Sequence, residues 1–140
     1  MSKVAVVFWS GTGNTEACAQ FVADGARNAG ADVEVFSVDQ FGAGKEAEYD
    51  GIALGCPAMG DEELEDSEFQ PMYDSIKDAL ASKKVVLFGS YGWGDGDWMN
   101  TWKADAEGAG ITLAADPVIV NEAPDDEAEA SLKALGAALV

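Results

Sequence analysis

Hydrophobic and polar residues alternate along the chain in blocks whose lengths suit strands and helices in turn. The first block, Lys3–Trp9, is apolar and partly β-branched, which is typical of a central strand buried on both faces. The next block, Asn14–Ala29, has helical periodicity and ends at Gly30. The apolar face predicted for this helix consists of Ala17, Phe21, Val22 and Ala26.

The same alternation continues to the end of the chain. Proline has no N–H to donate to a neighbouring strand, so Pro117 must interrupt the last predicted strand or place it on an edge. The further predicted strands are Asp32–Val38, Tyr49–Gly55, Lys84–Ser90 and Ile111–Val120. The further predicted helices are Phe69–Ser82, Asp97–Glu107 and Asp125–Leu139.

Five strands that alternate with four or five helices predict a three-layer α/β fold. We expect one doubly wound, five-stranded parallel sheet in a single domain over residues 1–140, without internal repeat or linker. Three polar loops follow strand ends, at Ser10–Thr15, Cys56–Asp66 and Ser90–Trp98. Because ligands bind at the carboxyl ends of strands in such sheets, these loops are the expected site.

The charge balance excludes several partners. The chain has 26 acidic and 8 basic residues, a net charge of −18, so neither nucleic acid nor an anionic membrane surface is an expected partner. The balance suits a partner with a basic face. The apolar runs are too short to cross a bilayer, and the first residues do not form a secretory signal, so we expect a cytoplasmic protein.

The chain contains no histidine, which removes the commonest general base and the commonest transition-metal ligand. Catalysis by a Ser-His-Asp or Cys-His arrangement is therefore excluded, and no metal site is expected. Cys18 and Cys56 form no CxxC motif and are predicted to be two buried free thiols.

The loop after the first strand predicts an anion site. A strand, a short loop with two glycines and a helix let backbone N–H groups converge on a phosphate. Glu16 occupies the third glycine position of the dinucleotide fingerprint, and the Walker lysine is absent, so one terminal phosphate fits best. The alternative, a simple helix cap, needs only one polar residue. The predicted phosphate ligands are Ser10, Gly11, Thr12, Gly13, Asn14 and Thr15.

The three loops together resemble those of the flavodoxins. "SGTGNT" resembles their phosphate loop, and "GCPAMGDEELEDSEF" and "LFGSYGWGDGDWM" resemble their two isoalloxazine loops, in the same order. The resemblance covers essentially the whole chain. It is closest to the short-chain flavodoxins of anaerobic bacteria, since no long insertion interrupts the last strand. It implies one non-covalent FMN and one-electron transfer between larger redox enzymes.

The resemblance also implies roles for single residues in the second and third loops. Trp93, which three nearby glycines leave with little local packing, covers the outer face of the flavin, and Met59 covers part of the inner face. The Gly60 carbonyl turns towards flavin N5 in the semiquinone, and the Glu62 side chain accepts from flavin N3–H. An ordinary core role suits Trp98 and Trp102 better than Trp93. The other predicted loop ligands are Pro57, Ala58, Asp61, Ser90, Tyr91, Gly92 and Gly94.

Six carboxylates fall within eight positions of the second loop. Such a run usually forms a solvated face, and beside a flavin it also lowers the reduction potential. The six residues are Asp61, Glu62, Glu63, Glu65, Asp66 and Glu68.

These observations predict a low-potential electron carrier rather than an enzyme. We expect a monomer whose FMN cycles between semiquinone and hydroquinone, and which docks on basic surfaces of redox enzymes such as ferredoxin-type donors and acceptors. The alternative is an FMN-dependent oxidoreductase of the same fold, of the quinone reductase type, which needs a substrate cleft. A response-regulator receiver domain shares the fold but requires an acidic pair where this chain has Ser10–Thr15.

Overall fold

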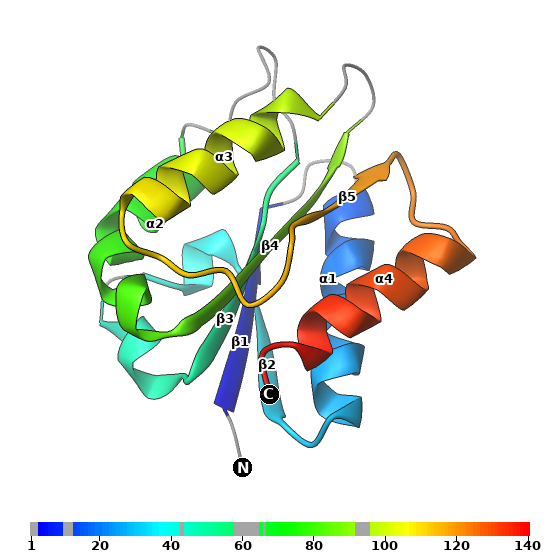
Figure 1. Cartoon of the computed structure of the whole chain (residues 1–140), viewed down its shortest axis with the longest axis horizontal. Helices are drawn as coiled ribbons and strands as arrows, with labels where there is room; N and C mark the ends of the chain where they lie inside the picture. Colours follow the sequence, from blue (N-terminus) through cyan, green and yellow to red (C-terminus); the bar gives the residue numbers. More distant parts are fainter. Residues whose placement is uncertain (1–2, 10–12, 43, 58–64, 66, 92–95) are drawn as a thin grey trace.

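The computed structural model describes residues 3–9, 13–42, 44–57, 65, 67–91 and 96–140, and it places them in three layers (Figure 1). The central layer is a five-stranded parallel sheet with the strand order β2-β1-β3-β4-β5. The strands are β1 Lys3–Phe8, β2 Asp32–Ser37, β3 Gly51–Gly55, β4 Lys84–Tyr91 and β5 Val118–Asn121.

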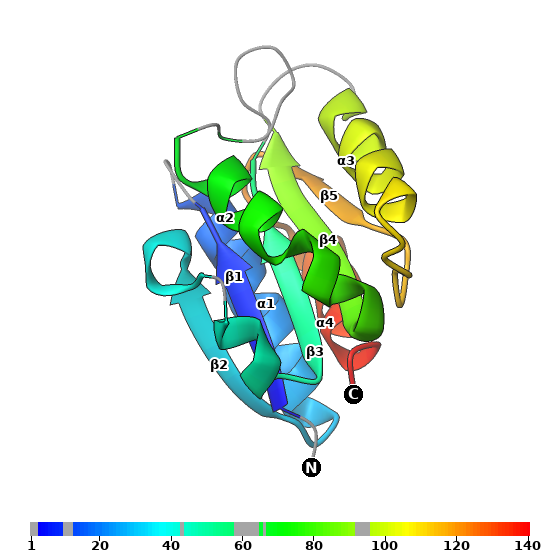
Figure 2. The same cartoon turned by 90° about the vertical axis from the view of Figure 1, so that its left-hand side faces the viewer.

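Four α-helices cover the two faces of the sheet within the described residues. Figure 2 shows α2 and α3 in front of the sheet, while α1 and α4 lie behind it. Three short 3₁₀ helices complete the described elements. The α-helices are α1 Asn14–Asn28, α2 Phe69–Ile76, α3 Asp97–Gly108 and α4 Asp126–Ala137. The 3₁₀ helices are Val38–Gln40, Lys45–Glu48 and Lys77–Ser82.

The sheet separates two hydrophobic cores, and alternate residues of each strand enter opposite cores. In β1, Ala5 and Val7 face the core under α2 and α3, whereas Val4 and Val6 face the core under α1 and α4. Because β1 lies between β2 and β3, the chain winds outward from it in both directions. The predicted doubly wound, single-domain parallel sheet is confirmed.

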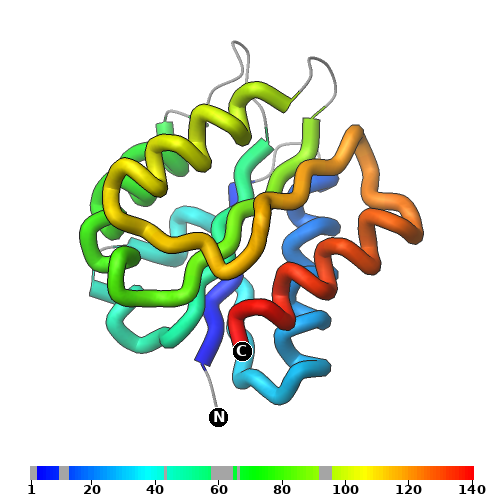
Figure 3. The backbone as a smooth tube through the Cα atoms, viewed as in Figure 1, coloured from blue at the N-terminus to red at the C-terminus, as the bar shows by residue number. Residues whose placement is uncertain are grey.

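The winding brings all strand carboxyl ends to one edge of the sheet. Figure 3 follows the backbone from the start of β1 at the lower edge, where the C-terminus also lies. Lys84 Nζ, at the start of β4, donates to the Val140 carbonyl oxygen over 3.3 Å. Within the described ranges, no helix has both the length and the hydrophobicity needed to cross a membrane.

The prediction of a strand over Ile111–Val120 is wrong for its first half. Only Leu113 bridges to Val85 in that stretch, and β5 begins after Pro117 and extends to Asn121. A proline cannot donate to a ladder, so regular pairing starts beyond it, on an edge strand as expected. The predicted helix Phe69–Ser82 changes to a 3₁₀ helix after Ile76. Both helix types bury apolar residues spaced three or four apart, so the pattern does not separate them.

The buried face of α1 is rotated from the predicted one. Val22 and Ala26 are buried as expected, but Ala17 and Phe21 are only partly buried. The reason is the contact with α4, which crosses α1 at Gly25 and Gly136. The buried residues of α1 are Thr15, Cys18, Ala19, Val22, Ala23, Gly25 and Ala26.

Candidate functional site

The carboxyl edge of β1, β3 and β4 carries the start of each of the three predicted loops. The predicted site residues that the structure describes are Gly13, Asn14, Thr15, Pro57, Ser90 and Tyr91. The predicted site residues outside the described ranges are Ser10, Gly11, Thr12, Ala58, Met59, Gly60, Asp61, Glu62, Gly92, Trp93 and Gly94.

The N-terminus of α1 presents neutral hydrogen-bond donors at this edge. Gly13 is the N-cap residue and has φ 95°, a conformation that favours glycine. It has no side chain to cap the helix, so α1 begins without a side-chain cap from its own N-cap residue. None of the eight basic residues of the chain lies in the three loops. Backbone amides and hydroxyl groups without a cation fit a single phosphate group.

A buried hydrogen bond joins the first loop to the third. Thr15 Oγ1 and Ser90 Oγ lie 2.9 Å apart, and Thr15 is 1% exposed. These residues are 75 positions apart in the sequence. The fold therefore brings together two loops that the sequence linked only by their place after strand ends.

Cys56 connects the second loop to the third, a role that we did not predict. Its backbone N–H donates to the Phe88 carbonyl (3.2 Å), and its carbonyl accepts from Trp98 Nε1 (3.2 Å). Gly89 makes this possible, because a Cβ atom at position 89 would overlap the Cys56 carbonyl oxygen. The sequence signal for the close approach was the glycine in the middle of a strand.

The cysteine thiols are buried and protonated. Burial raises the pKa of the Cys56 thiol to about 12 and that of the Cys18 thiol to about 11. A thiol with so high a pKa is not a nucleophile at neutral pH. The prediction of two buried free cysteines is confirmed.

Glu65 is an exception to the solvated face that is usual for an acidic run of this kind. Its side chain is 7% exposed and accepts backbone N–H groups from Ser67 (3.1 Å), Glu68 (2.7 Å) and Phe69 (2.9 Å). Burial by itself raises the pKa of this carboxyl, but the backbone donors together lower the pKa below its usual value. Glu65 thus caps the start of α2. No signal in the sequence separates Glu65 from its acidic neighbours, because Glu68 lies closer to the start of the helix.

Of the other acidic residues in this run, the structure describes only Glu68. It is exposed, and its Oε1 accepts from Trp9 Nε1 over 3.4 Å. Asp61, Glu62, Glu63 and Asp66 lie outside the described ranges.

The tryptophans at the start of the third helix are core residues, as predicted. Trp98 and Trp102 are 1% and 2% exposed. The Tyr91 and Trp98 rings lie 5.6 Å apart between centroids, so the last residue of β4 packs against the start of α3.

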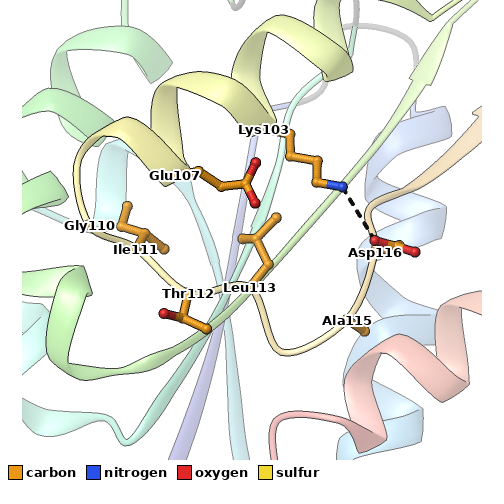
Figure 4. Close-up of a pocket in the computed structure, with 8 residues that line it drawn as sticks. All are labelled: Lys103, Glu107, Gly110, Ile111, Thr112, Leu113, Ala115 and Asp116. Atoms are coloured by element: carbon orange, nitrogen blue, oxygen red, sulfur yellow. Dashed lines mark hydrogen bonds and ion pairs between the residues drawn. The ribbon is translucent and has the colours of Figure 1, made fainter.

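One described cavity borders the site and a larger one lies elsewhere. A cavity of about 320 Å³ lies at the carboxyl ends of β1 and β2, next to Trp9 and Glu16. The larger cavity, about 580 Å³, lies between α3 and the segment that leads to β5 (Figure 4). The Lys103–Asp116 ion pair (3.4 Å) of the larger cavity is exposed to solvent. Neither of these two cavities is lined by a predicted site residue.

Comparisons with known proteins agree with this geometry. The flavodoxin family model matches residues 6–134. The chain is 49% identical to a flavodoxin of Megasphaera elsdenii, over 90% of this chain and 91% of that protein, and 45% identical to one of Clostridium beijerinckii, over 86% and 88%. The solution structure of two-electron reduced Megasphaera elsdenii flavodoxin superposes with a TM-score of 0.89, at 48% identity over 97% of each chain.

The similarity decides between the functions that the sequence left open. The relatives named flavodoxin match along most of the chain, which supports the electron carrier, and the comparisons do not favour the quinone reductase alternative over it. The chain belongs to the flavodoxin family, whose members are electron-transfer flavoproteins that bind FMN and are not enzymes.

Proposed function

We propose that this protein is a low-potential, one-electron carrier whose three loops hold a single non-covalent FMN. The observation that supports this most directly is the buried Thr15–Ser90 hydrogen bond beside the N-terminus of α1, because it joins two of the loops around neutral donors. The proposed FMN ligands are Ser10, Gly11, Thr12, Gly13, Asn14, Thr15, Pro57, Ala58, Met59, Gly60, Asp61, Glu62, Ser90, Tyr91, Gly92, Trp93 and Gly94.

Bound FMN supplies a ring system that takes up and returns electrons singly. The protein residues bind and orient it, and the acidic surface sets the cost of adding charge. A carboxylate roughly 10 Å from the ring raises that cost by about 0.4–1.7 kcal/mol, depending on the effective dielectric constant. For a one-electron couple this corresponds to about 20–70 mV per carboxylate. Several acidic residues near the second loop therefore favour a low potential.

The phosphate assignment predicts that FMN binds far more tightly than riboflavin. We expect at least a 100-fold difference in Kd, because riboflavin lacks the group that the α1 N-terminus would bind. Thr15→Val keeps the shape of the side chain and removes its hydroxyl group. It should weaken FMN by about 1–3 kcal/mol, the usual loss for a hydrogen bond to a charged group. Riboflavin should lose less affinity, because it lacks the phosphate and is affected only through the lost Thr15–Ser90 hydrogen bond.

Fluorescence titration of the apoprotein with each flavin measures both affinities. Equal affinities for FMN and riboflavin would contradict the phosphate site. We expect FAD to bind poorly, since a loop formed around a phosphate monoester leaves no room for the adenylate.

We also propose that redox partners use their own basic surfaces to dock on the carboxyl edge of this sheet. In a parallel α/β fold, helix N-termini and strand carboxyl ends share one edge, and helix dipoles favour acidic residues there. The acidic residues at this edge include Glu16, Asp39, Glu68, Asp97, Glu122, Asp125 and Asp126. The opposite edge carries the basic residues Lys3, Arg27, Lys77, Lys83 and Lys84, together with acidic residues such as Asp32, Asp50 and Glu107. We propose further that the protein acts as a monomer in the cytoplasm.

Charge-directed docking predicts a strong dependence on salt. The second-order rate of electron transfer to a basic c-type cytochrome should fall at least tenfold between about 0.01 and 0.2 M salt, because screening weakens steering. The control reaction uses an uncharged quinone, whose rate should change less than twofold. Stopped-flow absorbance measures both rates, and equal salt dependence for the two oxidants would contradict the docking proposal.

A further inference from the structure

We propose that Glu65 and Cys56 form a clamp that fixes the two ends of the second flavin loop, and that Glu65 is a positioning residue for FMN. The inference rests on the proposed function, in which residues of this loop contact the flavin. Neither side chain is a proposed ligand. Their effect on FMN passes through the backbone that they hold.

The first half of the clamp is the contact between the two ends of the loop. The Glu65 backbone N–H donates to Cys56 Sγ over 3.4 Å in a buried position. The Cys56 thiol lies close to the next carbonyl, with Sγ 3.5 Å from the Pro57 oxygen. Cys56 directly follows β3, and its backbone is tied to Phe88 and Trp98. The end of β3 is therefore joined directly to Glu65, nine positions later.

The second half of the clamp is the attachment of Glu65 to α2. Three consecutive backbone N–H groups, from Ser67, Glu68 and Phe69, converge on its carboxylate. The Glu65 carbonyl also accepts from the Gln70 N–H over 2.8 Å. Phe69 is fully buried against the core, so the start of α2 is a fixed support.

Together these contacts set the separation and direction of the chain at both ends of the loop. A ligand loop whose ends are fixed loses less conformational freedom on binding, which strengthens affinity without any direct contact. Exposed caps, by contrast, act on their own helix alone. Asp125 provides such a comparison, because its Oδ1 accepts one N–H from Ala128 (2.8 Å) at the start of α4 and the residue belongs to none of the three loops.

The test compares FMN affinity with apoprotein stability in three variants. Glu65→Ala removes the clamp. Glu65→Gln keeps one oxygen, which can still accept from Glu68 and Phe69, but removes the charge and the acceptor for Ser67. Asp125→Ala removes a cap of the same chemistry elsewhere. We expect Glu65→Ala to raise the FMN Kd about 10- to 100-fold and Glu65→Gln to raise it less than about fivefold. Asp125→Ala should leave the Kd within about twofold of wild type while lowering the urea midpoint.

A second measurement separates positioning from a general loss of stability. In a double-mutant cycle, Cys56→Ala should weaken FMN several-fold alone, but add little to Glu65→Ala, since both act through one clamp. If Glu65→Ala does not fold, Glu65→Asp gives the same comparison, because the shorter side chain cannot reach all three N–H groups. The visible circular dichroism of bound FMN should change in Glu65→Ala and not in Asp125→Ala.

The outcomes distinguish failure of the clamp from failure of the proposed function. If the wild-type protein does not bind FMN, the proposed function is wrong. If it binds FMN and Glu65→Ala binds equally well, the clamp is overturned and Glu65 is only a helix cap. If Glu65→Gln loses as much affinity as Glu65→Ala, keeping the acceptor for Glu68 and Phe69 does not preserve affinity, and the positioning role is also overturned.

Discussion

Replacing Gly136 with alanine is expected to lower the free energy of unfolding of the apoprotein by about 2–4 kcal/mol. At this position α4 crosses α1, and an added Cβ atom would overlap the Val22 carbonyl oxygen. The same close contact exists on α1, where a Cβ atom at Gly25 would overlap the Lys133 carbonyl oxygen of α4. Since the obstacle is helix backbone, the two helices must move apart, and overpacking of this kind costs more than the helix propensity gained.

Gly108 provides a matched control for this substitution. It is also a helical glycine, at the end of α3, but nothing lies within 4 Å of the position that its Cβ atom would take. Gly108→Ala should leave stability unchanged or raise it by up to about 1 kcal/mol. Urea unfolding followed by circular dichroism measures both variants. Equal effects at positions 108 and 136 would show that the crossing tolerates separation.

The order of the elements could be predicted because each strand and helix shows its own periodicity in the sequence. The site edge followed from the same order, since parallel strands all end on one side. What the sequence could not provide was the contact of elements distant along the chain. The rotation of α1 depends on Gly136, more than a hundred positions away, and no local pattern contains it.

Glu65 shows the same limit within the candidate site. In the sequence it is one of six neighbouring carboxylates, and nothing in the residue type separates it from the other five. Its difference arises from the burial of Phe69 and from the position of Cys56, which turn one carboxylate towards the start of α2. Prediction from the sequence pattern succeeded for residues whose role depends on their neighbours along the chain. It failed where the acting groups meet only in the folded chain.

Trp98→Phe is expected to destabilise the apoprotein by about 1–3 kcal/mol more than Trp102→Phe. The two indoles are almost equally buried, but they differ in the partner of Nε1. Trp98 Nε1 donates to the Cys56 carbonyl, so its loss leaves a buried acceptor unpaired. Within the described part of the chain, Trp102 Nε1 has no hydrogen-bond partner. The Tyr73 ring packs edge-on against the Trp102 ring, and its hydroxyl donates to Asp105 over 3.0 Å.

In Trp102→Phe the stability lost with the ring volume is therefore partly offset by removal of an unpaired buried donor, whereas in Trp98→Phe nothing offsets that loss.

The two variants should also differ in FMN affinity. Cys56 begins the second flavin loop, so release of its carbonyl from Trp98 should weaken FMN several-fold, while Trp102→Phe should leave FMN affinity within about twofold of wild type. Urea unfolding of both apoproteins, with flavin titration of each, measures the two effects independently. Equal stability losses would mean that the Trp98–Cys56 hydrogen bond contributes nothing net to the fold. Unchanged FMN affinity in Trp98→Phe would mean that this hydrogen bond is not needed to position Cys56.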